Sequence, residues 1–320
     1  MGKIVIAAPQ RDAAKVAEIQ ARHPNSELVV AANRDQVLDL IGDADGLFGA
    51  PNAMEFAAAE QLKWIQAGSA GVEWLWNIPA LQGRDDVVVT NMRSAHAATI
   101  ADHCFAMLLY FTRAIPQWKE LHDKAEWGRG QVQGRMVALE GKTIGILGFG
   151  NIGRAIGRRG AGFGMKVLAV DAHPGAPGDG AEEVWPLDRL DDMCKAVDVL
   201  AISAPITPQT RGLISPERIG MLKHGSWVMV MSRGNIVDEP TLIKALESGQ
   251  VAAAGLDVTH EEPLPSSDPL WKAPNCIITP HTSAMSPLTM GHVWRIFEEN
   301  LGRFERGEPL MNVVDKNLGY

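Results

Sequence analysis

Short apolar runs alternate with amphipathic stretches along the chain from Lys142 onward. The runs are rich in residues typical of buried strands and cover Thr143–Leu147, Lys166–Val170, Asp198–Ser203, Ser226–Met231, Ala252–Val258 and Cys276–Thr279. Between them, stretches such as Leu187–Val197 and Thr241–Ser248 place apolar residues at helical spacing. Six strands separated by helices predict a doubly wound, parallel Rossmann sheet that is buried on both faces.

The first hundred residues repeat this alternation on a smaller scale. Strand-like runs cover Ile4–Ala8, Leu28–Ala31, Gly46–Gly49, Trp64–Gln66 and Val87–Thr90, and Ala13–Ala21 has helical spacing. A long helical pattern from Ala97 to about Tyr110, with more helix after Pro116, links the two regions. The helical segment Pro287–Arg306 has no strands of its own to cover, so we expect it to return to the first of two α/β domains.

Composition and charge narrow the functional classes. The 320 residues are 46% apolar and 21% charged, which excludes a disordered or fibrous chain and suits two domains. A formal net charge of −8 argues against a nucleic-acid or anionic-membrane partner, since both need a basic surface. It does not exclude an anionic substrate, because a few buried cations can outweigh a distant surface field.

Targeting signals and cysteine motifs are not apparent. The apolar start at Ile4–Ala8 is too short for a secretory signal, and the run Cys104–Phe111 is too short to cross a bilayer. The cysteines Cys104, Cys194 and Cys276 are far apart and odd in number. We expect buried free thiols, no metal site, and a cytoplasmic protein.

A glycine-rich loop follows the strand Thr143–Leu147 directly and opens a helical pattern. The loop is Gly148, Phe149, Gly150, Asn151, Ile152 and Gly153. In such a loop the first glycine permits a tight turn, the second lets the backbone approach a pyrophosphate, and the third lets helix and strand pack closely. The free N–H groups of the helix start then face the phosphates. The context predicts a dinucleotide site, against the alternative of a nucleotide-free domain with a glycine turn.

The choice of dinucleotide depends on Asp171, which ends the next strand, Lys166–Val170, 18 residues after Gly153. A carboxylate there accepts hydrogen bonds from the ribose hydroxyls and repels a 2′-phosphate. NAD is therefore expected rather than NADP, although the nearby His173 would tolerate a phosphate.

Three polar residues follow successive predicted strands. Arg233 comes after Ser226–Met231, Glu262 after Ala252–Val258, and His281 after Cys276–Thr279. Loops at the carboxyl ends of parallel strands meet at one crevice. Reduction of a ketone by hydride needs a proton donor, which an imidazole supplies, and an adjacent carboxylate holds one tautomer. An arginine can grip a substrate carboxylate with two charge-assisted hydrogen bonds.

Each of these residues also has a simpler explanation when it is taken alone. The chain has nine histidines, most of which need no catalytic role, and Arg-Gly or Glu-Pro after a strand is often only a turn or a solvated loop. His96 and His103 are read as capping or core hydrogen-bonding residues. The tryptophans Trp64, Trp74, Trp76, Trp118 and Trp127 are expected to pack on the linking helix or a dimer surface.

Together these motifs resemble the D-isomer-specific 2-hydroxyacid dehydrogenase family. The matching segments are Leu147–Gly153, Met231–Asp238, Ala254–Val258 and Pro280-His281, with weaker similarity at Val89–Asn91 and Gly307–Val314. The resemblance spans nearly the whole chain. It implies a NAD-dependent oxidoreductase that acts on a small 2-keto or 2-hydroxy acid of D configuration.

The resemblance also implies residue roles. Arg233 would bind the substrate, His281 would be the acid/base and Glu262 would orient it, while Asp257 would bond the nicotinamide amide. Backbone N–H groups around Gly68, Ser69, Ala70 and Gly71 would hold the substrate carboxylate. The implied organisation is a discontinuous, flavodoxin-like substrate domain (1–96 and 286–320), a dinucleotide-binding domain (97–285), and a homodimer.

Two departures from the family pattern concern the implied hinge near 94–97 and 284–287. Ser94 stands where many members have glycine, and 282–287 lacks the glycine-rich run that is common after the histidine. Glyoxylate and hydroxypyruvate are the first substrates expected, then pyruvate or bulkier 2-keto acids. No long segment follows Tyr320, which counts against a feedback-controlled phosphoglycerate enzyme.

Two alternatives remain open. One is a NAD-sensing binding protein of the same fold with little turnover, against which the complete Arg233, Glu262 and His281 set counts. The other is an enzyme that oxidises formate or phosphite on a similar scaffold. The formate enzymes resemble the chain less, because they have glutamine at the position of Glu262.

Overall fold

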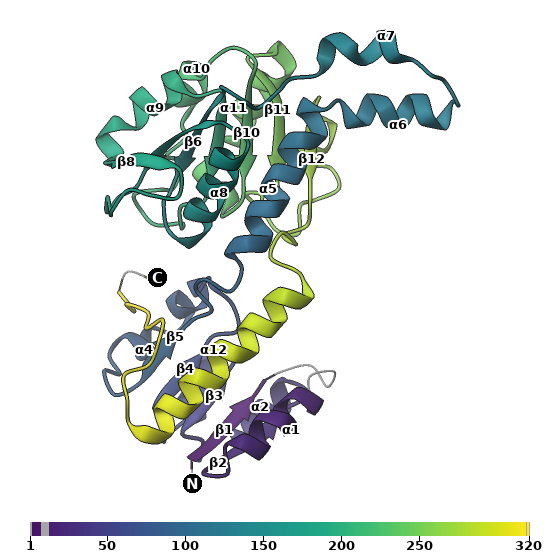
Figure 1. Ribbon diagram of the computed structural model, residues 1–320. Helices are drawn as coiled ribbons and strands as arrows, with labels where there is room; N and C mark the ends of the chain where they lie inside the picture. Colours follow the sequence, from purple (N-terminus) through teal and green to yellow (C-terminus); the bar gives the residue numbers. More distant parts are fainter. Residues whose placement is uncertain (1, 8–12, 318, 320) are drawn as a thin grey trace. The chain divides into compact units, whose positions relative to one another are not determined.

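The computed structural model describes residues 2–7, 13–317 and 319, which form two compact units (Figure 1). The interrupted unit comprises Met1–His96 and Ser286–Tyr320, and the continuous unit comprises Ala97–Met285. Ala8, the predicted end of the first strand, lies outside the described residues. Among the described residues, none of the helices combines the length and apolar character needed to span a membrane.

The continuous unit contains a seven-stranded parallel sheet in the order β12-β11-β10-β9-β6-β7-β8. Its strands are β6 (Thr143–Leu147), β7 (Lys166–Val170), β8 (Ala181–Trp185), β9 (Val199–Ile202), β10 (Ser226–Val230), β11 (Val251–Leu256) and β12 (Cys276–Ile278). Its helices are α5 (Ala97–Thr112), α6 (Ile115–Asp123), α7 (Arg129–Val132), α8 (Asn151–Gly162), α9 (Leu190–Ala196), α10 (Pro216–Met221) and α11 (Glu239–Ser248).

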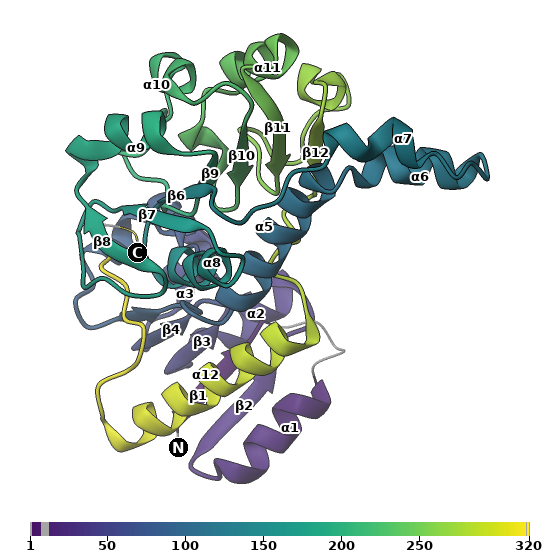
Figure 2. The same cartoon turned by 45° about the horizontal axis from the view of Figure 1, so that its top comes forward.

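Alternating side chains bury both faces of this sheet. Val228 and Val230 of β10 face α9, α10 and α11, whereas Met229 faces α5 and α8. Figure 2 shows these two helical layers around the strands. Because both faces of the sheet are covered, successive residues of each central strand are buried, and the strands form continuous apolar runs in the sequence. The predicted fold class, a doubly wound parallel sheet beside a second α/β domain, is confirmed.

The expectation of six strands in this sheet is wrong, because β8 is a seventh. β8 pairs with β7 at the edge of the sheet, and its sequence includes the exposed Glu182 and Glu183. An edge strand has one free side and needs no apolar run, so its hydrophobic signal is weak. β6 and β7 match their predicted spans, and β9 to β12 differ from theirs by one or two residues at the ends, as expected of boundary assignments.

Helix boundaries follow local capping chemistry. α11 begins at Glu239, two residues before the predicted start, because the Asp238 side chain accepts a hydrogen bond from the Thr241 N–H. Proline is tolerated in the first turn, where its missing N–H would have no partner, so Pro240 does not delay the helix. α6 likewise begins at Ile115 and includes Pro116.

The interrupted unit contains a five-stranded parallel sheet in the order β2-β1-β3-β4-β5. Its strands are β1 (Gly2–Ile6), β2 (Ser26–Val30), β3 (Gly46–Phe48), β4 (Trp64–Gln66) and β5 (Val88–Thr90). Its helices are α1 (Ala13–Arg22), α2 (Arg34–Leu40), α3 (Ala53–Ala58), α4 (Pro79–Gln82) and α12 (Pro287–Arg306).

The C-terminal helix α12 completes one face of this smaller sheet. Ile4 and Ile6 pack with α1 and α12, whereas Val5 faces the side covered by α2 and α3. The ring of Phe297 on α12 stacks on Trp64 with centroids 5.8 Å apart. Trp64 is therefore a core residue of the interrupted unit, which corrects its expected place on the linking helix or a dimer surface. Trp127, by contrast, is almost fully exposed.

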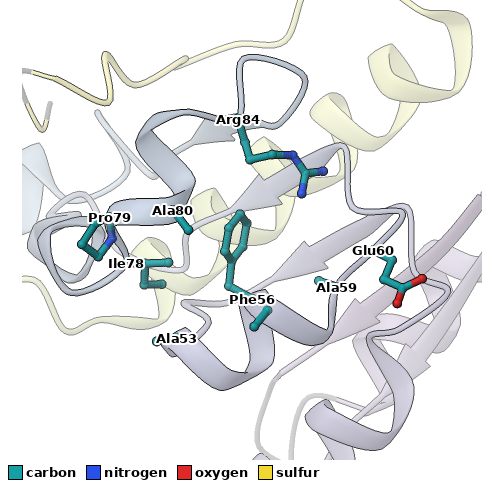
Figure 3. A pocket seen from close by; sticks show the side chains of 9 residues that line it. Ala53, Phe56, Ala59, Glu60, Ile78, Pro79, Ala80 and Arg84 are labelled. Carbon is teal, nitrogen blue, oxygen red and sulfur yellow. The ribbon is translucent and has the colours of Figure 1, made fainter.

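A hollow on the interrupted unit lies between α3 and the segment Ile78–Arg84 (Figure 3). Its wall is apolar at Phe56 and Ile78, with the charged Glu60 and Arg84 also in its lining. Arg84 is held by a two-pronged ion pair with Asp86. None of the lining residues belongs to the predicted site.

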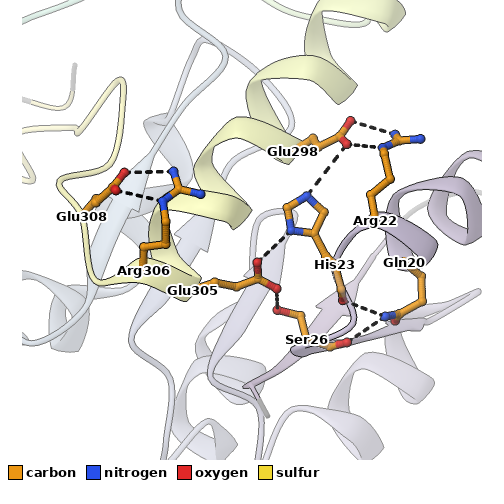
Figure 4. Close-up of polar contacts among 8 residues, drawn as sticks. All are labelled: Gln20, Arg22, His23, Ser26, Glu298, Glu305, Arg306 and Glu308. Carbon is orange, nitrogen blue, oxygen red and sulfur yellow. Dashed lines mark hydrogen bonds and ion pairs between the residues drawn. The ribbon is translucent and has the colours of Figure 1, made fainter.

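A polar cluster joins α12 to α1 and β2 (Figure 4). The Glu305 carboxylate accepts from the Ser26 hydroxyl and lies 2.8 Å from His23 Nδ1, while Arg22 pairs with Glu298 through two nitrogens. Side chains that are 276 to 282 positions apart thus hold the C-terminal helix on the N-terminal segment.

The three cysteines are free, as expected. Burial raises the pKa of the Cys104 and Cys276 thiols to about 12 and that of Cys194 to about 11, so all three are protonated and unreactive near neutral pH. Within the described part of the chain, no group of three or more metal-ligating side chains is placed to hold an ion.

Candidate active site

The order of strands in the continuous unit reverses at β6, because β7 lies on one side of it and β9 on the other. In open parallel sheets the crevice at such a switch point, beyond the carboxyl ends of the strands, is where ligands bind. The loop after β6 is the glycine-rich segment that begins at Gly148, and the loop after β9 begins at Ser203.

Two of the three loop glycines are required by close packing within the protein. Gly148 has a φ of +87°, and a Cβ there would lie 2.5 Å from the Cα of Ala204. A Cβ on Gly153 would lie 2.1 Å from the carbonyl oxygen of Gly148. The tight turn and the close helix–strand packing expected of these glycines are both present.

The middle glycine meets no such constraint. Gly150 is exposed, and a Cβ added there would find no heavy atom within 4 Å. It is the N-cap residue of α8, a helix of 12 residues whose first N–H groups have no side-chain cap. An open backbone at the start of a long helix fits a phosphate-bearing ligand, since the N–H groups and the helix dipole both favour an anion.

Asp171 lies against this loop. Its Oδ2 accepts from the Phe149 N–H at 2.7 Å, and its Oδ1 accepts from the His173 N–H at 2.9 Å. Each carboxylate oxygen can accept a further bond, so the side chain can still take ribose hydroxyls. These residues fit the adenosine half of a dinucleotide.

Two arginines of α8 are engaged beside the loop. Arg154 lies over the Phe149 ring at 4.9 Å, and both Arg154 and Arg158 pair with Asp179. The Arg158 hydrogen bond is the main cause of the lowered pKa of the Asp179 carboxyl. Both positive charges are thus partly neutralised by an acidic residue of the segment that follows Asp171.

Ser203 was not identified from the sequence. Its hydroxyl donates to the Gly148 carbonyl oxygen at 2.7 Å, so it joins the loops after β9 and β6. The only signal for it would have been its position directly after an apolar run. That signal becomes informative once β9 is known to lie next to β6.

His281 and Glu262 are in contact, as their placement after neighbouring strands predicts. His281 Nδ1 lies 2.7 Å from Glu262 Oε2, and both side chains are partly exposed, at 45% and 38%. Glu262 Oε1 also accepts from the Thr259 N–H at 3.2 Å. The carboxylate makes Nδ1 a hydrogen-bond donor, which leaves Nε2 as the nitrogen that can exchange a proton with a ligand.

Arg233 caps a short 3-10 helix (Gly234–Ile236) just beyond β10 and is half-buried. One of its guanidinium nitrogens donates to the Ser232 carbonyl oxygen at 2.7 Å. A Cβ on the next residue, Gly234, would lie 2.0 Å from the Thr259 carbonyl carbon. The turn that carries Arg233 therefore packs closely against Thr259, in the segment before Glu262.

Asp257, which the resemblance assigns to the nicotinamide amide, is bonded to the segment that carries His281. The residue is only 1% exposed, and its carboxylate accepts from the Thr279 hydroxyl at 2.6 Å and from the N–H groups of Thr282 and Ser283. Its backbone carbonyl accepts from the His281 N–H at 2.8 Å. Asp257 thus holds the turn on which His281 sits, with a φ of +53° at His281.

His103 and Thr279 extend this network and were not predicted to belong to it. His103 Nε2 lies 3.0 Å from the Thr279 hydroxyl oxygen. Because the single hydroxyl proton is donated to Asp257, the imidazole must be the donor in the His103 bond. The sequence prediction of a core hydrogen bond for His103 fits this geometry, but the partner could not be named from the sequence.

The predicted substrate loop belongs to the interrupted unit and follows β4. Gly68 and Ser69 are exposed, and the Ser69 hydroxyl donates to the Gly71 carbonyl oxygen at 2.6 Å. The Ala70 carbonyl accepts from the Asn91 side chain at 2.9 Å. These bonds define the loop's shape within its own unit and use none of its backbone N–H groups.

Comparison with known proteins identifies the family. Residues 105–283 match the sequence profile of the D-isomer specific 2-hydroxyacid dehydrogenase family, NAD binding domain. The match covers more than half of the chain. The chain belongs to this family. The profile also confirms the prediction of a nicotinamide dinucleotide as the cofactor class.

Curated relatives of this 2-hydroxyacid dehydrogenase family member carry enzyme names. A D-3-phosphoglycerate dehydrogenase of Methanocaldococcus jannaschii is 32% identical over 98% of this chain, which spans 60% of the length of that relative. A hydroxypyruvate reductase of Blautia hydrogenotrophica is 31% identical over 88% of each chain. The alternative of a binding protein with little turnover is not favoured by these relatives.

A solved structure supports the same assignment. The D-isomer specific 2-hydroxyacid dehydrogenase family protein of Aeromonas salmonicida superposes with a TM-score of 0.88 at 33% identity, covering 98% of this chain and 99% of the other. The similarity therefore extends over both units of this family member.

Proposed function

We propose that this protein transfers a hydride between NAD(H) and a small 2-keto or 2-hydroxy acid of D configuration. The observation that carries the proposal is the 2.7 Å contact between His281 Nδ1 and Glu262 Oε2, in loops at the same sheet edge as the glycine loop. A positioned imidazole beside a hydride carrier provides the proton that ketone reduction needs. Glyoxylate and hydroxypyruvate are the first candidates, and the name of the hydroxypyruvate reductase relative supports the second.

The roles of the side chains follow from their chemistry. His281 Nε2 gives a proton to the substrate oxygen in reduction and takes it back in oxidation, while Glu262 holds the tautomer. Arg233 binds the substrate carboxylate with two charge-assisted bonds, helped by backbone N–H groups of Gly68–Gly71. NAD, when bound, accepts or supplies the hydride. We assign its pyrophosphate to Gly148–Gly153 and its adenosine ribose to Asp171, and its nicotinamide amide would approach Asp257.

Domain roles and assembly belong to the same proposal. Residues 97–285 would bind the dinucleotide, and residues 1–96 with 286–320 would bind the substrate. A homodimer is supported by apolar side chains on the α6–α7 arm of the continuous unit, which projects away from its sheet in Figure 2. Trp127 on this arm is 96% exposed and Ile115 is 44% exposed. A cytoplasmic location is supported by the three free thiols.

A panel of 2-keto acids with NADH and NADPH tests this function, with turnover followed by loss of the reduced cofactor's absorbance. We expect reduction of glyoxylate or hydroxypyruvate, with NADH preferred through Asp171. Formate and phosphite are included with NAD as oxidised substrates. NADH binding without turnover of any acid would support the binding-protein alternative, and a clear NADPH preference would contradict the role given to Asp171.

A further inference from the structure

A second histidine–carboxylate pair lies between the proposed catalytic loops. His260 Nδ1 is 2.5 Å from Glu239 Oε2, and the His260 backbone N–H donates to Glu239 Oε1 at 2.7 Å. His260 is two residues before Glu262, and Glu239 is six residues after Arg233. The pair thus connects the segment after β10 to the segment after β11.

Glu239 is an unusual residue to find buried. It is 6% exposed in the first turn of α11, and burial raises the pKa of its carboxyl. A buried carboxylate is costly unless it is well hydrogen-bonded, and here both oxygens accept bonds from one residue. Because both carboxylate oxygens of Glu239 bond to His260, we infer that the contact fixes the position of His260.

Further contacts join the same two segments. The Asn235 side chain donates to the His260 carbonyl oxygen at 3.1 Å. The Gly234 backbone lies so close to Thr259 and His260 that a Cβ on Gly234 would be 2.5 Å from the His260 nitrogen. The Gly234 backbone, the Asn235 side chain and the Glu239 carboxylate therefore all contact residues 259–260.

We propose that the His260–Glu239 pair is a positioning element that holds the Arg233 turn in register with the Glu262–His281 pair. The inference rests on the proposed function, because it assigns Arg233 to the substrate and His281 to proton transfer. A chain of contacts links the two sites. Glu239 accepts from His260, the neighbouring Thr259 N–H donates to the Glu262 carboxylate, and Glu262 contacts His281. A displacement of about 1 Å between such groups can cost about 100-fold in rate.

The test compares His260→Ala with His260→Asn. The amide nitrogen of asparagine can take the place of Nδ1 and donate to Glu239, whereas alanine leaves the buried carboxylate without that donor. We expect kcat/KM for the keto acid to fall about 10- to 100-fold in His260→Ala and to be largely restored in His260→Asn. The Kd of NADH, measured by its fluorescence, stays within about twofold, since the glycine loop is untouched.

A matched control removes a pair of the same kind from the interrupted unit. His23→Ala deletes the contact with Glu305 on α12 (Figure 4) and should lower Tm while leaving kcat and KM unchanged. Hydrogen exchange provides a readout that does not depend on turnover: in His260→Ala, protection should decrease in 231–239 and 257–263 and stay unchanged in 143–170.

Several results would overturn the positioning role. They are unchanged kcat/KM in His260→Ala, equal impairment in His260→Asn, or exchange protection that does not differ from the unmodified protein. A wild-type protein that binds NADH but reduces no keto acid would instead refute the proposed function. The exchange measurement separates that case, since it reports the coupling of the two segments directly.

Discussion

The Nδ1 of His281 lies 2.7 Å from the Oε2 of Glu262, although the two residues are 19 positions apart. β11 and β12 are adjacent parallel strands, so the loops that follow them both begin at the carboxyl ends of the strands, on the same side of the sheet. Because the carboxylate accepts a hydrogen bond, the proton lies on Nδ1, and Nε2 is left as the nitrogen that can exchange a proton with a ligand.

Replacement of His281 by asparagine should remove the proton donor and keep a polar side chain at the turn. We expect kcat to fall by about 10²- to 10⁴-fold. NADH affinity should stay the same, because the residue contacts none of the glycine loop. Steady-state kinetics and NADH fluorescence titration check both points, and near-normal turnover at neutral pH would remove His281 from the mechanism.

Glu262→Gln keeps the size of the side chain and removes its charge. An amide can present its NH₂ group to Nδ1 and so favour the wrong tautomer, with Nε2 protonated and fixed. We expect kcat to decrease by at least about 10-fold with a smaller change in the KM for the keto acid. Glu261→Gln, the exposed neighbour, serves as the control. Equal effects of the two substitutions would contradict the assignment.

The glycines of the loop should separate stability from cofactor binding. Gly150→Ala meets open space in the structure, so Tm should be unchanged while the Kd of NADH rises about tenfold or more. Gly153→Ala places a methyl 2.1 Å from the Gly148 carbonyl and should cost about 1–3 kcal/mol of stability. Gly162→Ala, in open space at the end of the same helix, is the control. Calorimetry and NADH titration distinguish these outcomes; tight NADH binding by Gly150→Ala would argue against a pyrophosphate at this loop.

The Asp257 network should contribute to stability as well as to the placement of His281. Thr279→Val removes the hydroxyl that links Asp257 to His103, and we expect a loss of about 1–3 kcal/mol in the free energy of unfolding with a reduced kcat. Thr112→Val removes an intrahelical bond to the Leu108 carbonyl and should leave kcat unchanged. Urea unfolding and kinetics measure the two effects. Equal kcat in both variants would place the network outside catalysis.

The His260–Glu239 pair should make stability depend on pH. The hydrogen bond to Glu239 raises the pKa of His260, whose imidazole also faces Asp268 and Glu261, and burial raises the pKa of Glu239. The folded protein therefore holds protons that the unfolded chain releases. The His260 contribution is complete below its unfolded value of 6.5 and is lost as pH rises through the higher folded value.

We therefore expect Tm to decrease from about pH 6.5 to about pH 8.5. The decrease should be smaller in His260→Asn, because asparagine at position 260 does not titrate. Thermal unfolding followed by circular dichroism at both pH values provides the measurement. A steeper pH dependence in the variant would show that other groups dominate.

The sequence alone determined the fold class, the glycine loop and the three residues Arg233, Glu262 and His281 as candidates. These follow from local signals: apolar runs of strand length, glycines between strand and helix, and polar residues directly after strands. Such patterns are readable because buried parallel strands must be apolar, and because parallel strands bring their carboxyl ends to one edge.

Only the tertiary structure decided which groups hold the candidates in place. β8 is a polar edge strand, and the bonds of Asp257 to Thr279 and of Glu239 to His260 join residues 21 or 22 positions apart. A buried carboxylate and its donor have no periodicity, and their pairing depends on strand order and loop conformation. The candidate residues Glu262 and His281 were therefore visible in the sequence, whereas the hydrogen bonds that orient them required the fold.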